Sequence, residues 1–119
     1  MRAAFSLAAV VAAALCAAGA MAAPASLTVS PSMVEAGHAV KVKGNADGCP
    51  VGDAVTILSR AFVHTHDFAG VPAIFARVRT GGKFAVRTTI PVHKKQGRYT
   101  ITARCGGGNL GVVAHLRVV

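Results

Sequence analysis

Apolar and polar side chains alternate along several short stretches after residue 23, and this alternation limits the fold more than any other feature of the chain. In the stretch Val40-Lys41-Val42-Lys43, for example, valine and lysine alternate. Successive side chains of a β-strand point to opposite sides, so the valines are expected on a buried face and the lysines in solvent. No stretch of ten residues there follows the 3.6-residue period of a helix. The pattern therefore predicts an all-β fold.

The alternating stretches are separated by clusters of Gly, Pro, Asn and Asp, which are the residues that favour turns. We expect strands at residues 27–30, 39–44, 54–59, 73–79, 83–90, 99–105 and 112–118. Seven short strands joined by turns are typical of a β-sandwich, in which two sheets cover one core. The sequence thus predicts a seven-stranded antiparallel sandwich with immunoglobulin-like strand order.

Residues 1–22 have the features of a secretory signal peptide. Arg2 supplies a positive charge, an Ala-rich apolar stretch follows, and Ala20-Met21-Ala22 fits the small-x-small rule. We expect cleavage after Ala22, because a cut one residue later would put proline directly beyond it. An uncleaved membrane anchor is the alternative, but Ala drives insertion weakly and no basic cluster follows. The prediction is one secreted domain, residues 23–119, extracellular or attached to the cell wall, without a stable membrane span.

Two cysteines, Cys49 and Cys105, remain after Cys16 leaves with the signal peptide. An even number of cysteines in an exported chain is typical of a disulfide. In an immunoglobulin-like order the second and sixth strands end at the same pole, and both cysteines fall there. A disulfide between them would close a loop of about 56 residues. Chain entropy alone would then stabilise the folded state by about 4 kcal/mol. Metal-binding thiolates and free thiols are the alternatives, and neither is favoured outside the cytosol.

Basic residues outnumber acidic ones before and after processing. The formal charge of the whole chain is +9, and without Arg2 the mature chain keeps 12 basic and 4 acidic residues, which gives +8. Such a surface attracts polyanions, among them anionic cell-wall polymers, anionic lipid and nucleic acid. The alternative is that the charge serves solubility alone.

Several basic side chains are expected on one outer face, because the second and fifth strands are neighbours in an immunoglobulin-like sheet. They are Lys41, Lys43, Lys83 and Arg87, with His93, Lys94, Lys95 and Arg98 at the rim. Aromatic side chains do not interleave with them, so no specific nucleic acid is expected as a partner. The predicted partner of this surface is an anionic cell-envelope polymer or another surface protein.

His64, His66 and Asp67 form the most suggestive cluster for metal binding. In an extended loop the alternation would aim His64 and His66 the same way. A third or fourth ligand is not visible nearby, and His93 and His115 would contribute only if the fold brought them close. The incomplete ligand set favours a polar loop over a metal site.

Catalytic motifs are missing from the sequence. The four acidic residues lie near predicted turns without forming a pair, and no serine has a nucleophile-elbow motif around it. Residues 106–111 match G-x-G-x-x-G, but a strand rather than a helix is expected after them, so a hairpin turn is favoured over a nucleotide site. We expect no enzymatic activity and no cofactor.

Three motifs together resemble the immunoglobulin-like domains of secreted actinobacterial proteins. They are Leu27-Thr28-Val29-Ser30-Pro31-Ser32, the stretch Gly48-Cys49-Pro50-Val51-Gly52-Asp53, and Gly97-Arg98-Tyr99-Thr100-Ile101-Thr102-Ala103-Arg104-Cys105-Gly106. The resemblance implies an exported sandwich in which Tyr99 forms a tyrosine corner. Composition and resemblance together predict a secreted, non-enzymatic binding or cell-envelope interaction module.

A narrower resemblance joins Ala23-Pro24 and Val40-Lys41-Val42 to the enediyne-carrying apoproteins, which are small secreted sandwiches. It implies a small-molecule carrier that holds a chromophore in a cleft between the sheets. The chain departs from that family because it offers one long-range cysteine pair instead of two short-range disulfides. A chromophore carrier is therefore the alternative function.

Overall fold

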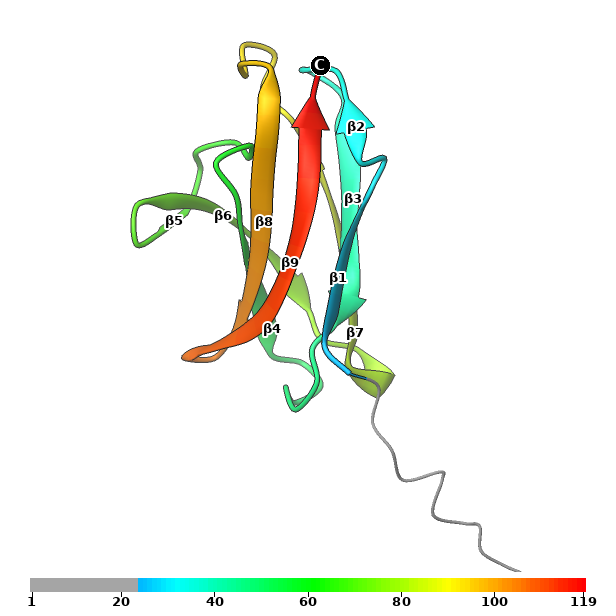
Figure 1. Cartoon of the computed structure of the whole chain (residues 1–119). Helices are drawn as coiled ribbons and strands as arrows, with labels where there is room; N and C mark the ends of the chain where they lie inside the picture. Colours follow the sequence, from blue (N-terminus) through cyan, green and yellow to red (C-terminus); the bar gives the residue numbers. More distant parts are fainter. Residues whose placement is uncertain (1–23) are drawn as a thin grey trace, which may run out of the picture.

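Two β-sheets pack face to face in the structure, a computed structural model that describes residues 24–119 (Figure 1). The strands are β1 (Ser26–Ser30), β2 (Met33–Val34), β3 (Ala39–Asn45), β4 (Ala54–Leu58), β5 (Asp67–Phe68), β6 (Val71–Arg77), β7 (Lys83–Thr89), β8 (Gly97–Cys105) and β9 (Gly108–Val118). One sheet has the order β1-β3-β7 and the other the order β2-β9-β8-β4-β6-β5. This arrangement confirms the all-β, two-sheet fold. The expected signal peptide, residues 1–22, lies outside the described residues.

The described part of the chain contains nine strands where seven were expected. Each expected stretch forms one strand, and the two additional strands, β2 and β5, have only two residues each. Two residues show no period, so alternation does not reveal them. β2 carries the chain from one sheet to the other, because β1 pairs with β3 whereas β2 pairs in parallel with β9. No helix in residues 24–119 is long and apolar enough to span a membrane.

One core lies between the sheets and is built from the apolar half of each alternating pattern. Its fully buried members include Val40, Val42, Val55, Ile57, Phe62, Ile90, Ile101, Leu116 and Val118. The lysines that alternate with the β3 valines are exposed. The inward valines and outward lysines expected of β3 are therefore confirmed, and a similar alternation of more and less buried residues runs through β4, β8 and β9.

β8 and β9 form a longer hairpin than the sequence indicated. The strands begin at Gly97 and Gly108, earlier than the expected starts at residues 99 and 112, and Cys105 pairs with Gly108 across a two-residue turn. Gly106 in that turn has a φ of 61°, a conformation that favours glycine. Residues 106–111 thus belong to a hairpin, as expected, but four of these six residues lie in β9. Glycine has no side chain to mark alternation, which explains the late predicted start.

Candidate binding surfaces

The outer side of the three-stranded sheet carries a group of cations that we call the basic face: Lys41, Lys43, Lys83 and Arg87. β3 and β7 are neighbours, and Lys41 lies directly opposite Arg87 in their antiparallel register. Val42 and Val86, one step along, form the adjacent pair and point inward to the core. All four cations of the basic face are exposed. The period of two therefore determines which side of β3 and β7 is charged.

A hollow of about 600 Å³ lies on this sheet, and we call it the lysine hollow. Its lining is Pro24, Ser26, Thr28, Lys41, Lys43, Gly44, Asn45, Arg79, Lys83, Phe84 and Ala85. No carboxylate is part of this lining, while three lysines and Arg79 are. Sequence reasoning missed Arg79, which it placed at the end of a strand. The Gly81-Gly82 turn was the available signal, because it reverses the chain and brings Arg79 beside Lys83.

Asn45 fixes that turn to the end of the sheet. Its side chain is 8% exposed, and its Nδ2 donates a hydrogen bond of 2.8 Å to the carbonyl of Gly81. The amide of Ala46 donates to Gly82 O at 2.8 Å, so two bonds hold the turn. A Cβ at Gly82, where φ is 81°, would lie 3.0 Å from Asn45 Oδ1. The turn therefore needs glycine, and Asn45 sets the position of the two cations that flank it.

The charge of the basic face is not neutralised within the described residues. The two contacts between basic and acidic side chains found in residues 24–119 join histidines to acids: His38 to Glu35 at 3.9 Å and His64 to Asp67 at 2.9 Å. No lysine or arginine of this part of the chain pairs with a carboxylate. Like charges directly opposite each other on two strands are destabilising, by up to about 1 kcal/mol. An anion bound at this face would remove that cost.

Lys94 and Lys95, which were expected to extend the basic face, do not line the lysine hollow. They lie in the β7–β8 connection, at the opposite end of β7 from Lys83. Lys94 Nζ donates a hydrogen bond of 2.8 Å to the carbonyl of Arg60. Lys95 O accepts a bond of 2.7 Å from the Tyr99 hydroxyl, the backbone contact expected of a tyrosine corner. Arg98, also expected at the rim, lies on β8 in the other sheet.

His64 and His66 point to different partners. Residues 64–66 form a turn rather than an extended loop, so the alternation expected there is wrong. His64 Nδ1 contacts Asp67 Oδ1 at 2.9 Å, whereas the His66 ring packs edge-on against Phe75 with centroids 5.3 Å apart. His93 lies in the β7–β8 connection, and His115 lies on β9 opposite Thr100. The structure does not bring these imidazoles together.

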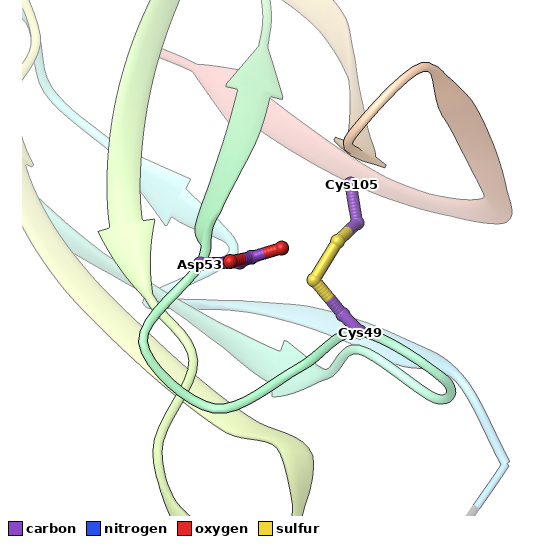
Figure 2. A group of neighbouring side chains, drawn as sticks. All are labelled: Cys49, Asp53 and Cys105. Atoms are coloured by element: carbon purple, nitrogen blue, oxygen red, sulfur yellow. A yellow bond between two sulfur atoms is a disulfide. The ribbon is translucent and has the colours of Figure 1, made fainter.

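Cys49 and Cys105 form a disulfide, which confirms the expected pairing (Figure 2). Cys49 follows β3, Cys105 ends β8, and their Cα atoms are 6.2 Å apart. The carboxylate of Asp53 points toward the bond, and one ligand atom from each of the three residues lies within 4.8 Å of the others. Zinc binds cysteine as a thiolate, and a disulfide offers none. In this oxidised form the group is a covalent link between the sheets.

Two hollows of residues 24–119 open on outer surfaces of the sandwich, and the first is the lysine hollow. The second has a volume of about 480 Å³ and lies over β8 and β4 on the six-stranded sheet. Between the sheets, inward side chains such as Val42 and Leu116 are fully buried. This placement favours binding on a surface over binding in a cleft between the sheets.

Comparison with known proteins connects the chain to other proteins by fold alone. No protein-family model matches the sequence, and no curated protein does either. The structure matches those of the adhesin InvE and of InvD from Yersinia pseudotuberculosis, each with a TM-score of 0.59, at 20% and 17% identity. The alkylpurine DNA glycosylase AlkC of Pseudomonas fluorescens matches at a TM-score of 0.50 and 19% identity, over 77% of this chain and 29% of that one. The two Yersinia matches cover 80% of this chain, which spans about a quarter of their lengths, 26% and 27%.

Proposed function

We propose that the chain is an exported, non-enzymatic binding module that holds an anionic cell-envelope polymer on its basic face. The observation that carries the proposal is the lysine hollow, where Lys41, Lys43, Lys83 and Arg79 meet without a carboxylate. The disulfide supports a location outside the cytosol. The likeness to an adhesin supports a role at the cell envelope. The resemblance to immunoglobulin-like domains of secreted actinobacterial proteins agrees with the same role.

The form of the site suits a polymer backbone rather than a small ligand. The cations are spread along β3 and β7 and are exposed, so several can contact successive anionic groups at once. Lysine contributes a mobile point charge, which suits variable spacing between those groups. Exposed charges are screened over about 8 Å at physiological ionic strength, so binding should weaken as salt rises. Affinity then depends on charge density more than on the sequence of the polymer.

The test measures the affinity for heparin, a soluble anionic polymer, at several salt concentrations. For a polyanion the slope of log affinity against log salt reports the number of anionic contacts, and each lost contact lowers it by about one. We expect Lys41→Gln with Lys43→Gln to lower this slope by about two. Pull-down on isolated cell-wall polymer at the same salt concentrations should give the same ranking.

Arg77→Gln with Arg104→Gln is the matched control. It removes the same charge from residues outside the lysine hollow. We expect a smaller change in slope than for the Lys41 and Lys43 variant. Equal losses from the two variants would mean that net charge alone drives retention, and the basic face would then be a solubility feature.

A further inference from the structure

A second cluster of cations lies on the outer side of the six-stranded sheet. Arg98 of β8 lies directly opposite Arg117 of β9, and Thr100 lies opposite His115 one step further along this face. All four side chains are exposed, whereas Leu116, paired with Tyr99, is buried in the core. Arg98 and Arg117 therefore form a like-charge pair, just as Lys41 and Arg87 do on the other sheet. No carboxylate of residues 24–119 pairs with either arginine.

A hollow beside Arg98 adds the guanidinium group of Arg60, and we call it the arginine hollow. It has a volume of about 480 Å³ and is lined by Leu58, Ser59, Arg60, Val71, Arg98, Tyr99, Thr100 and Thr102. Two arginines and two outward threonines supply hydrogen-bond donors. Leu58 and Val71 supply an apolar surface next to them. As in the lysine hollow, no carboxylate is part of the lining.

Hydrogen bonds fix the two segments that carry Arg60 and Arg98. Lys94 Nζ donates to the carbonyl of Arg60 at 2.8 Å, which ties the β4–β5 connection to the β7–β8 connection. The Tyr99 hydroxyl donates to Lys95 O at 2.7 Å, which ties the β7–β8 connection to β8. Two side-chain bonds thus connect the segment that carries Arg60, through the β7–β8 connection, to the strand that carries Arg98. Preorganised donors lose less entropy when they bind a ligand.

We propose that the arginine hollow is a second site for the oxyanion groups of an anionic polymer, and that the module therefore binds two polymer chains, one on each sheet. The planar guanidinium group contacts a sulfate, phosphate or carboxylate through two parallel hydrogen bonds. The threonine hydroxyls donate to the remaining oxygens, and Leu58 and Val71 contact the apolar part of the repeat. The claim that two polymer chains are bound rests on the function proposed for the basic face, whereas the arginine site itself does not.

The two sites face away from each other. The outward sides of two sheets that share one core look in opposite directions. Figure 1 shows β8 and β9 side by side, with the β5–β6 hairpin projecting to one side of them. A short oligomer held on one outer face cannot reach the other. Two chains of a long polymer, by contrast, can be joined by one molecule of the protein.

Calorimetry with a heparin hexasaccharide at physiological salt tests the number of sites. We expect two sites per protein, one site after Arg60→Gln with Arg98→Gln, and one site after Lys41→Gln with Lys43→Gln. Arg77→Gln with Arg104→Gln removes equal charge from the same sheet outside the arginine hollow and should leave two sites. Two sites in the Arg60 and Arg98 variant, or a single wild-type site that this variant keeps, would overturn the proposal. A single wild-type site that this variant loses would leave the arginine site standing and refute the function proposed for the basic face. Loss of a site in the Arg77 and Arg104 variant would also overturn the proposal.

Light scattering with long-chain heparin tests the joining of chains. The wild type should form large particles when the positive charge of the protein nearly equals the negative charge of the heparin. The Arg60 and Arg98 variant and the Lys41 and Lys43 variant should each bind heparin without forming such particles. Particles formed by the Arg60 and Arg98 variant would contradict the proposal. If that variant loses one hexasaccharide site while the Lys41 and Lys43 variant keeps both, the arginine site stands and the function proposed for the basic face fails. Far-ultraviolet circular dichroism of each variant verifies that it is folded.

Discussion

The outer faces of the two sheets are both cationic, but only one of them is partly covered. On the three-stranded sheet the cations stand free over β3 and β7. On the six-stranded sheet the β5–β6 hairpin brings Phe68 over Arg104 of β8. The centroid of the Phe68 ring lies 4.9 Å from Cζ of Arg104. Ala73, which pairs with Leu58, points outward and is nevertheless fully buried. Alternation determines which side chains point outward, whereas connections decide which of them stay accessible.

The disulfide is the covalent link between these two faces, and its loss should have the largest effect. Cys49→Ser with Cys105→Ser removes a bond between the segment after β3 and the end of β8. We expect the free energy of unfolding to fall by about 2–5 kcal/mol. Urea unfolding of the oxidised wild type, the variant and the reduced wild type measures it.

The reduced wild type is the control for this variant and should match it. Both faces should lose heparin binding together as the variant unfolds, because one core supports both sheets. Equal stability of the oxidised wild type and the variant would contradict the prediction.

Residues of the three-stranded sheet were easier to predict than those of the six-stranded sheet. The strands β3 and β7 and their outward cations follow from alternation, because both strands are seven residues long and lie open on one side. The covering hairpin was not predicted, because β5 has two residues and no period. Phe62 lies outside every expected strand, yet it fills the core at 1% exposure. Arg79 and Arg60 entered the hollows through turns, whose three-dimensional course a local pattern does not encode.

Gly44→Ala should damage the three-stranded sheet alone. A Cβ at Gly44 would overlap the carbonyl of Ser26 on β1 and lie 2.9 Å from Cζ of Phe84. β1 would have to move away from β3, at a cost of about 1–3 kcal/mol. Hydrogen exchange should show faster exchange in β1 than in β8, and thermal unfolding should give the loss in stability.

Gly107→Ala is the control for Gly44→Ala in the other sheet. Nothing lies within 4 Å of a Cβ built at Gly107, so the substitution should change the stability little. A loss equal to that of Gly44→Ala would show that crowding is not the cause.

Asn45→Ala should weaken binding at the lysine hollow but not at the arginine hollow. Its effect on stability should be smaller than that of Gly44→Ala. The substitution removes the bond to Gly81 O and releases the turn that holds Arg79 and Lys83. One hydrogen bond contributes about 0.5–1.5 kcal/mol, so the unfolding midpoint should fall slightly. Heparin affinity at the basic face should fall while the site at Arg60 and Arg98 keeps its affinity. Equal losses at both sites would contradict a local role for Asn45.

Phe68→Ala should have the smallest effect on stability and the opposite effect on binding. The ring covers Arg104, and a cation–π contact at an exposed position contributes about 0.5–1 kcal/mol. Without the ring, the Arg104 guanidinium becomes accessible, and the cationic face of the six-stranded sheet becomes larger. Retention on heparin should therefore increase while the stability decreases slightly.

Phe75→Ala removes a similarly exposed ring that packs against His66 rather than an arginine, and it should leave retention unchanged. If both variants bind heparin as the wild type does, the hairpin does not limit the charge available on this face, and the contrast between a covered and an open face has no consequence for binding.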